Sequence, residues 1–218
     1  MFKKVLLTLM ILLFPTSLYA YEELDYSLIY QDLKIGKVKI VFWGEDFLDK
    51  KEVAKISFFV KLPGFKEEDI IYADLQNFLP LQVEREFRTL LKRRCVSEVY
   101  DQKNFKVKIV SRNKLREEIK KSKPIQNIIS FLYYLRRRDL KTGDVFKINL
   151  PTFEGKLFVR KEKRINISKK GYEAFLLETE PERLKIWIGK EERVPLLIED
   201  EFFIGRTKMI LERKGEKL

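Results

Sequence analysis

Residues 124–143, PIQNIISFLYYLRRRDLKTG, decide the fold of this 218-residue chain. Proline is tolerated in the first turn of a helix and glycine often follows the last turn, so Pro124 and Gly143 bracket a helical segment. At about 100° per residue, five apolar side chains of the segment fall on one face: Ile125, Ile128, Ile129, Leu132 and Leu135. We therefore predict one α-helix over about residues 125–139.

The segments on both sides of this helix alternate apolar and polar residues, as half-buried β-strands do. Residues 54–60 are one example, with Ala54, Ile56, Phe58 and Val60 on one face. About a dozen such strands, at roughly 8–12-residue spacing, predict an up-and-down sheet or open barrel. We expect a mainly β protein whose large curved antiparallel sheet wraps around the helix. Polar loops are expected at residues 44–51 and 112–123.

The first 20 residues have the features of a secretory signal peptide. Lys3 and Lys4 precede an apolar run over residues 5–14, and Ala20 offers a cleavage position. The run has about half of the ~20 residues that a membrane span needs, which favours cleavage over an uncleaved anchor. We expect cleavage near Ala20, export to the periplasm, and a single β-rich domain over residues 21–218.

Basic residues outnumber acidic ones, with 45 Lys and Arg against 33 Asp and Glu, a net charge of +12. Loss of residues 1–20 lowers this charge by two, since they hold two Lys and no acid. A basic exported protein can meet a lipid or another anionic envelope component, or an envelope protein. The alternative is a surface coated with ion pairs, as in thermophile proteins. Export disfavours a nucleic-acid partner.

The chain has no His and a single Cys. The missing His excludes Ser-His-Asp and Cys-His nucleophilic sites and His-ligated metals. The single Cys95 excludes an internal disulfide, and we expect it to be a partly buried structural thiol. Ser130 has no His to activate it, so we treat it as structural. We predict a protein that is not an enzyme and has no catalytic residue, metal or cofactor.

Arg136 is the unusual residue of the helix, because it falls in the middle of the apolar face. A charge facing a core is costly without a partner. The interpretation that we favour is an anchor of the helix end, which bonds sheet carbonyls, Asp139 or another carboxylate. The alternative is an anion-binding group at the mouth of a cavity. In that case Tyr133, Tyr134 and Trp187 are the accompanying ligand-binding candidates.

Several short motifs resemble the exported bacterial family known as domain of unknown function 3108 (DUF3108). The motifs are Leu24–Leu28 with Gly36, Ile71–Asp74 before Leu79-Pro80, Ser130–Arg136 with Leu140 and Gly143, Phe153-Glu154-Gly155, Ile186-Trp187-Ile188, Arg193-Val194-Pro195 and Gly205. The resemblance implies an envelope location and a β-rich fold, similar to the open half-barrels of lipoprotein carriers. It implies no established activity.

Three functions are compatible with these features. The first is a non-enzymatic protein that binds a hydrophobic or lipid-like ligand in the groove between sheet and helix. The second is a structural or interaction protein of the cell envelope with a filled core. The third and least supported is a hydrolase that uses a Ser/Lys or Asp/Glu pair. An apolar cavity of roughly several hundred Å³ beside the helix would distinguish the first from the second.

Overall fold

The computed structural model of the protein describes residues 21–167, 169–201 and 206–217. The predicted signal peptide over residues 1–20 and its cleavage site near Ala20 lie outside these residues. So does Gly205, one of the residues that carry the family resemblance.

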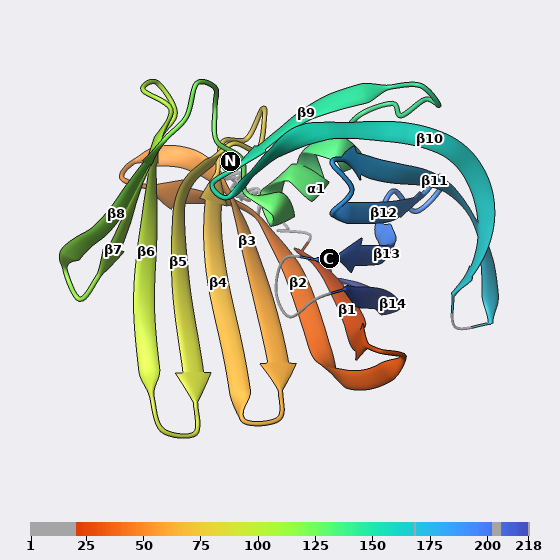
Figure 1. The fold of residues 1–218 in the computed structure, drawn as a ribbon, viewed down its shortest axis with the longest axis horizontal. Coiled ribbons are helices and arrows are strands. Elements are labelled where there is room, and N and C mark those ends of the chain that lie inside the picture. The colour runs from red at the N-terminus through yellow and green to blue at the C-terminus, as the bar shows by residue number, and fades with distance from the viewer. Residues whose placement is uncertain (1–20, 168, 202–205, 218) are drawn as a thin grey trace, which may run out of the picture.

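Fourteen strands of the described ranges form one antiparallel sheet around the helix (Figure 1). Along the chain these elements are β1 (Tyr21–Tyr30), β2 (Leu33–Leu48), β3 (Lys51–Leu62), β4 (Phe65–Ala73), β5 (Pro80–Thr89), β6 (Arg93–Asp101), β7 (Lys106–Ser111), β8 (Lys114–Lys120), α1 (Ile128–Arg136), β9 (Val145–Leu150), β10 (Phe153–Ile167), β11 (Lys170–Glu180), β12 (Leu184–Gly189), β13 (Pro195–Asp200) and β14 (Thr207–Lys217). The predicted mainly β fold with one helix is confirmed.

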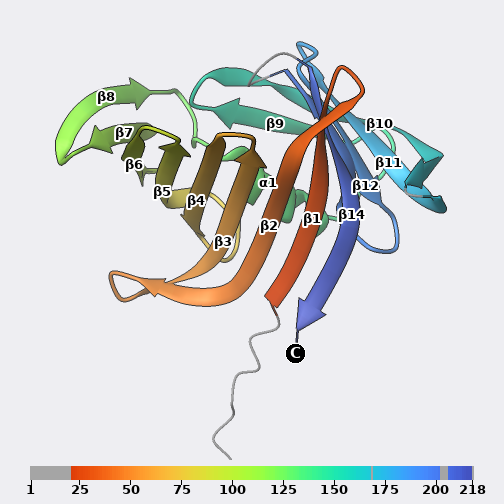
Figure 2. The ribbon, with the colours of Figure 1, turned by 90° about the horizontal axis from the view of Figure 1, so that it is seen from below.

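The sheet runs from edge strand β8 back to β1, then through β14 to the other edge strand, β9. Because β1 pairs with both β2 and β14, the first and last strands of the chain join the two halves of the sheet. The two edge strands are not paired with each other, so the barrel stays open. The halves curl towards one another and enclose α1 (Figure 2).

Two segments that we expected to be loops are strands instead. β2 continues to Leu48 through the predicted loop 44–51, and β8 occupies most of the predicted loop 112–123. The connecting turns contain no glycine, but Asp49-Lys50 and Arg112-Asn113 all adopt positive φ between 47° and 68°. Paired positive φ values build the two-residue hairpin turns that match strand twist. The turns are therefore tight although their sequences lack the usual glycine signal.

The helix is shorter than the predicted 125–139 and spans Ile128–Arg136. Asn127 is extended, and its side chain caps the helix by accepting hydrogen bonds from the backbone of Ile129 and Ser130. The preceding Gln126 bonds to the backbone of Asn149 in β9 instead of joining the helix. The apolar residue Ile125 is buried as predicted, but as part of this extended segment.

α1 is buried on nearly every side, not along one stripe, because the sheet surrounds it. Its buried residues are Ile129, Ser130, Phe131, Leu132, Tyr133 and Leu135. The helix lies towards one end of the strands, and the β1–β2, β3–β4 and β5–β6 hairpin tips lie at the other end (Figure 1). None of the helices in the described ranges has the length and apolarity needed to cross a lipid bilayer.

Candidate functional site

Arg136 at the end of α1 forms a buried ion pair with Glu22 of β1. Its two terminal nitrogens donate to the two carboxylate oxygens at 2.6 Å each, and its Nε donates to the carbonyl of Arg193. Both side chains are at least 86% buried, with exposed fractions of 13% and 14%. The bidentate geometry makes Arg136 an anchor that ties the helix end to the sheet. Asp139, an expected partner, is exposed and lies near Lys141 and Arg193 instead.

The three aromatic candidates lie apart from one another. Tyr133 is buried and stacks on Phe42, with ring centroids 5.1 Å apart, beneath the guanidinium of Arg136. Burial raises the pKa of its hydroxyl. Tyr134 is half-buried and makes an edge contact with Phe146, with centroids 6.4 Å apart.

Trp187 of β12 alternates with the buried Ile186 and Ile188, so it lies on the outer face of the sheet. There it is half-buried and faces Leu176 and Leu197 of the neighbouring strands. Of the four residues predicted to bind a ligand, Arg136 and Tyr133 therefore lie together, whereas Tyr134 and Trp187 each lie elsewhere.

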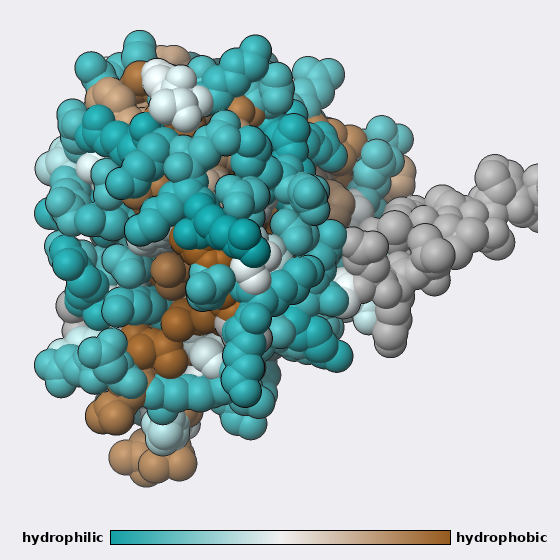
Figure 3. All heavy atoms as spheres, turned by 90° about the vertical axis from the view of Figure 1, so that its right-hand side faces the viewer, coloured by the Kyte–Doolittle hydropathy of each residue, from teal (hydrophilic) through white to brown (hydrophobic). Residues whose placement is uncertain are grey.

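The interior has an apolar cavity at the end of the sheet away from α1, which we call the rim cavity. Its volume is about 290 Å³. Ten residues from β1–β4, β13 and β14 line it: Leu28, Val38, Phe58, Val60, Leu62, Phe65, Glu67, Asp200, Thr207 and Met209. On one side of the molecule a strip of apolar atoms runs down between hydrophilic ones towards the hairpin-tip end (Figure 3). No residue of α1 lines the rim cavity, so this cavity is distinct from the predicted groove between sheet and helix.

Glu67, in the wall of the rim cavity, belongs to a buried charged cluster, which we call the Arg85 cluster. Arg85 of β5 contacts three carboxylates: Asp69 at 2.8 Å, Glu98 at 3.2 Å and Glu67 at 3.3 Å. All three acids are buried. The hydroxyl of Tyr100 donates to Glu98 at 2.6 Å. The cluster thus holds three acids and one guanidinium.

The burial of three acids around a single guanidinium changes the pKa values of Glu67 and Asp69. Burial, followed by the nearby charge of Asp69, raises the pKa of Glu67 from 4.5 to about 7. Burial also raises the pKa of Asp69, although Arg85 opposes the shift. Near neutral pH, Glu67 therefore exists partly as a neutral acid that can donate a hydrogen bond into the cavity. In the described residues, no group of three or more Asp, Glu, Cys or His is placed to hold a metal ion.

Our sequence interpretation did not single out Glu67 or Asp69, although a signal existed. In β4 the two acids fall at every second position together with Phe65, Ile71 and Ala73. They therefore lie on the inward, apolar face of the strand. Charged residues on such a face are rarely solvated. Cys95 was expected to be partly buried and is exposed, because it lies on the outer face of β6 opposite Glu86.

Comparison with known proteins gives a family and a fold. A family model described as "Protein of unknown function (DUF3108)" matches residues 25–212. No curated protein matches the chain. Among solved structures, the chain is similar to a β-barrel-like protein of domain of unknown function DUF1849 from Brucella abortus, with a TM-score of 0.50 and 8% sequence identity. The match covers 91% of this chain and 98% of that one, and at this identity it indicates the fold alone.

Proposed function

The chain belongs to the DUF3108 family of proteins of unknown function, and we propose that it is a non-enzymatic binding protein for a hydrophobic or lipid-like ligand. The ligand would place its apolar part in the rim cavity. We also propose that the protein acts in the periplasm after loss of residues 1–20. The observation that carries the proposal is the rim cavity itself, an apolar space bordered by inward-facing residues of the sheet.

The shape and lining of the rim cavity support an apolar guest. Inward-facing residues of six strands line the cavity. Eight of the ten lining residues carry no charge, and the two exceptions are Glu67 and Asp200. Its volume of about 290 Å³ lies at the lower end of the roughly 300–1,000 Å³ of small-molecule sites. A slender acyl chain fits such a space better than a fused-ring ligand does.

The polar groups of the cavity can recognise a polar group of a ligand. Glu67 on β4 and Asp200 on β13 are in the outermost of the strands that wall the cavity, and Asp200 accepts a hydrogen bond from Thr207 at 3.2 Å. A neutral Glu67 can bond to an ester, amide or hydroxyl group of a ligand. We therefore assign Glu67 to ligand orientation.

The proposal is tested by native mass spectrometry and lipid extraction of protein purified from its own envelope, followed by titration with a fluorescent fatty acid. We expect a co-purifying lipid and saturable binding. Val60→Trp fills the rim cavity and should weaken binding at least roughly tenfold, since overpacking costs about 1–3 kcal/mol. Val99→Trp is the matched control, because Val99 is a strand valine that is 45% exposed.

Two results would overturn the proposal. One is the absence of any co-purifying lipid together with no binding of the added fatty acid. The other is equal binding by the two tryptophan variants, once their melting temperatures show that both are folded. A loss of binding in Val99→Trp as well would also count against the rim cavity.

The alternative, an interaction protein of the envelope, has one observation in its favour. Both edges of the sheet are open, and each carries an exposed apolar residue, Leu115 in β8 and Val145 in β9. An extended segment of a partner can add to such an edge. However, Gln126 already bonds to the outer edge of β9 at Asn149, and β8 is rich in charge, which discourages pairing. A pull-down that depends on Val145 would support this alternative.

A further inference from the structure

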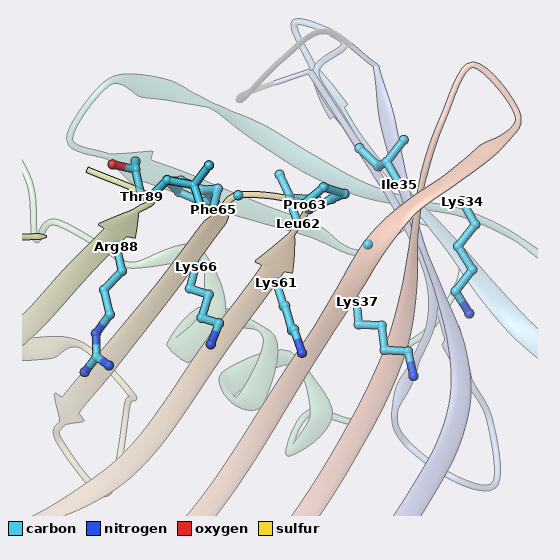
Figure 4. Close-up of a pocket in the computed structure, with 13 residues that line it drawn as sticks. Lys34, Ile35, Lys37, Lys61, Leu62, Pro63, Phe65, Lys66, Arg88 and Thr89 are labelled. Carbon is cyan, nitrogen blue, oxygen red and sulfur yellow. The ribbon is translucent and has the colours of Figure 1, made fainter. Parts of the chain in front are cut away.

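A row of cations crosses the outer face of the sheet close to the hairpin tips. In the strand register Lys37 lies opposite Lys61, Lys61 opposite Lys66, and Lys66 opposite Arg88. The four side chains lie side by side with their charged ends pointing the same way (Figure 4). Like charges directly opposite one another in adjacent strands destabilise a sheet. An anionic partner would relieve this repulsion.

None of the three lysines of this row forms a close ion pair within the described part of the chain, although Lys37 interacts at longer range with Glu212. Arg88 is bonded to Glu86, and the neighbouring Lys34 is bonded to Glu212 at 2.5 Å. Lys37, Lys61 and Lys66 form no ion pair with any described residue. We call them the lysine row.

Apolar residues lie next to the lysine row, at the strand ends. Leu33 at the start of β2 is 69% exposed, and Leu90 and Leu91 in the β5–β6 turn are 89% and 92% exposed. An open groove of about 750 Å³ runs between the lysines and these strand ends. Leu62 and Phe65 line both this groove and the rim cavity. The end of the sheet thus combines protruding apolar tips, cations behind them and the wall of the cavity.

We propose that the hairpin-tip end of the sheet docks on an anionic lipid bilayer. Leu33, Leu90 and Leu91 would enter the boundary between head groups and acyl chains, and the lysine row would lie against lipid phosphates. Charge complementarity is the reason to choose a bilayer: a flat array of phosphates can neutralise three adjacent lysines together. The exposed acid at these tips is Asp32, and Lys208 lies 3.5 Å from it. This inference does not depend on the rim cavity being occupied.

The test is co-sedimentation of the purified protein with vesicles of equal parts phosphatidylglycerol and phosphatidylcholine, or of phosphatidylcholine alone. We expect binding to the anionic vesicles that falls steeply between about 0.05 M and 0.5 M salt. The triple variant Lys37→Gln, Lys61→Gln, Lys66→Gln should lower the partition coefficient by roughly 100-fold. The matched control replaces the exposed Lys50, Lys103 and Lys120, which belong to the other end of the sheet, by Gln.

The double variant Leu90→Ser, Leu91→Ser should also weaken binding but leave its salt dependence unchanged. Equal binding by the lysine triple variant and its control would overturn the proposal, as would binding to phosphatidylcholine without any salt effect. Displacement by soluble glycerol phosphate would also overturn it, because that would indicate a site for one head group. Val60→Trp should still bind vesicles, so a failure of the rim cavity and a failure of docking give different results.

Discussion

The two ends of the sheet interior are built from the same alternation of apolar and polar residues, but the helix fills only one of them. Towards the start of β1, α1 fills the space, and its charged residue is paired with Glu22 and the carbonyl of Arg193. Towards the hairpin tips, the inward residues enclose a cavity of about 290 Å³, and Glu67 has a pKa raised to about 7. At the first end the buried charge of Arg136 is paired from within the protein. The second end has an apolar cavity and a carboxyl group that can contact a ligand.

This difference separates the residues that maintain the fold from those available for function. Arg136 and Tyr133 are the unusual residues of the sequence, but both are used in packing. Glu67, Val60 and the lysine row were not singled out in the sequence, yet they lie at the end of the sheet that α1 does not fill.

Arg136→Leu should destabilise the protein most. It leaves Glu22 as a buried carboxylate without its guanidinium, a loss of roughly 3–5 kcal/mol and about 10 °C in melting temperature. Arg138→Leu should change the free energy of unfolding by less than about 0.5 kcal/mol, because the Arg138 side chain is exposed. Urea and thermal unfolding measure both. Equal melting temperatures would show that the helix end is not anchored by this pair, and recovery in the double variant Glu22→Leu, Arg136→Leu would confirm it.

Truncating one leucine at each end compares the packing directly. Leu135 in α1 is fully buried among the core residues, so Leu135→Ala should cost about 3 kcal/mol. Leu28 is also buried but borders the rim cavity, and Leu28→Ala should cost about 1–2 kcal/mol because it loses fewer contacts. Chemical denaturation of both variants gives the difference. If Leu28→Ala costs as much as Leu135→Ala, the rim end is packed as tightly as the helix end.

The architecture was predictable because alternation and helical periodicity are local patterns. The sequence predicts strands on both sides of one helix, and it also predicts a partnered Arg136. It did not reveal where the helix begins, because Asn127 and Gln126 bond to the backbone in ways that depend on β9. Nor did it reveal the rim cavity, which exists because α1 spans only one end of the curved sheet. That outcome depends on the register and curl of strands far apart in the chain.

Glu67→Gln should change the dependence of stability on pH at the rim end. The pKa of Glu67 is higher in the folded protein, at about 7, than its ordinary value of 4.5, so folding takes up a proton between these values. Its stabilising contribution is complete below pH 4.5 and is lost as pH rises through 7. The variant should therefore nearly match the wild type at pH 4.5 and be about 3 kcal/mol more stable at pH 8.

Unfolding curves across this pH range test the effect. Glu68→Gln is the control, since Glu68 lies on the outer face of the same strand and is exposed. The groups that face Glu67 are Asp69, Glu98 and Arg85. A profile for Glu67→Gln as steep as that of the wild type would mean that Asp69 is responsible for the pH dependence.

The smallest effect is expected from Lys61→Gln, and it distinguishes a surface selected for binding from one that merely carries charge. Lys61 has Lys37 on one side and Lys66 on the other, so its removal should relieve repulsion and stabilise the protein by roughly 0.2–1 kcal/mol. Lys103→Gln, in the β6–β7 turn, should be neutral. The gain should shrink at high salt, because screening weakens the repulsion. If Lys61→Gln destabilises the protein, the aliphatic part of the lysine side chain supports packing at the hairpin-tip end. If the variant is more stable but binds vesicles less well, Lys61 serves binding at a cost in stability.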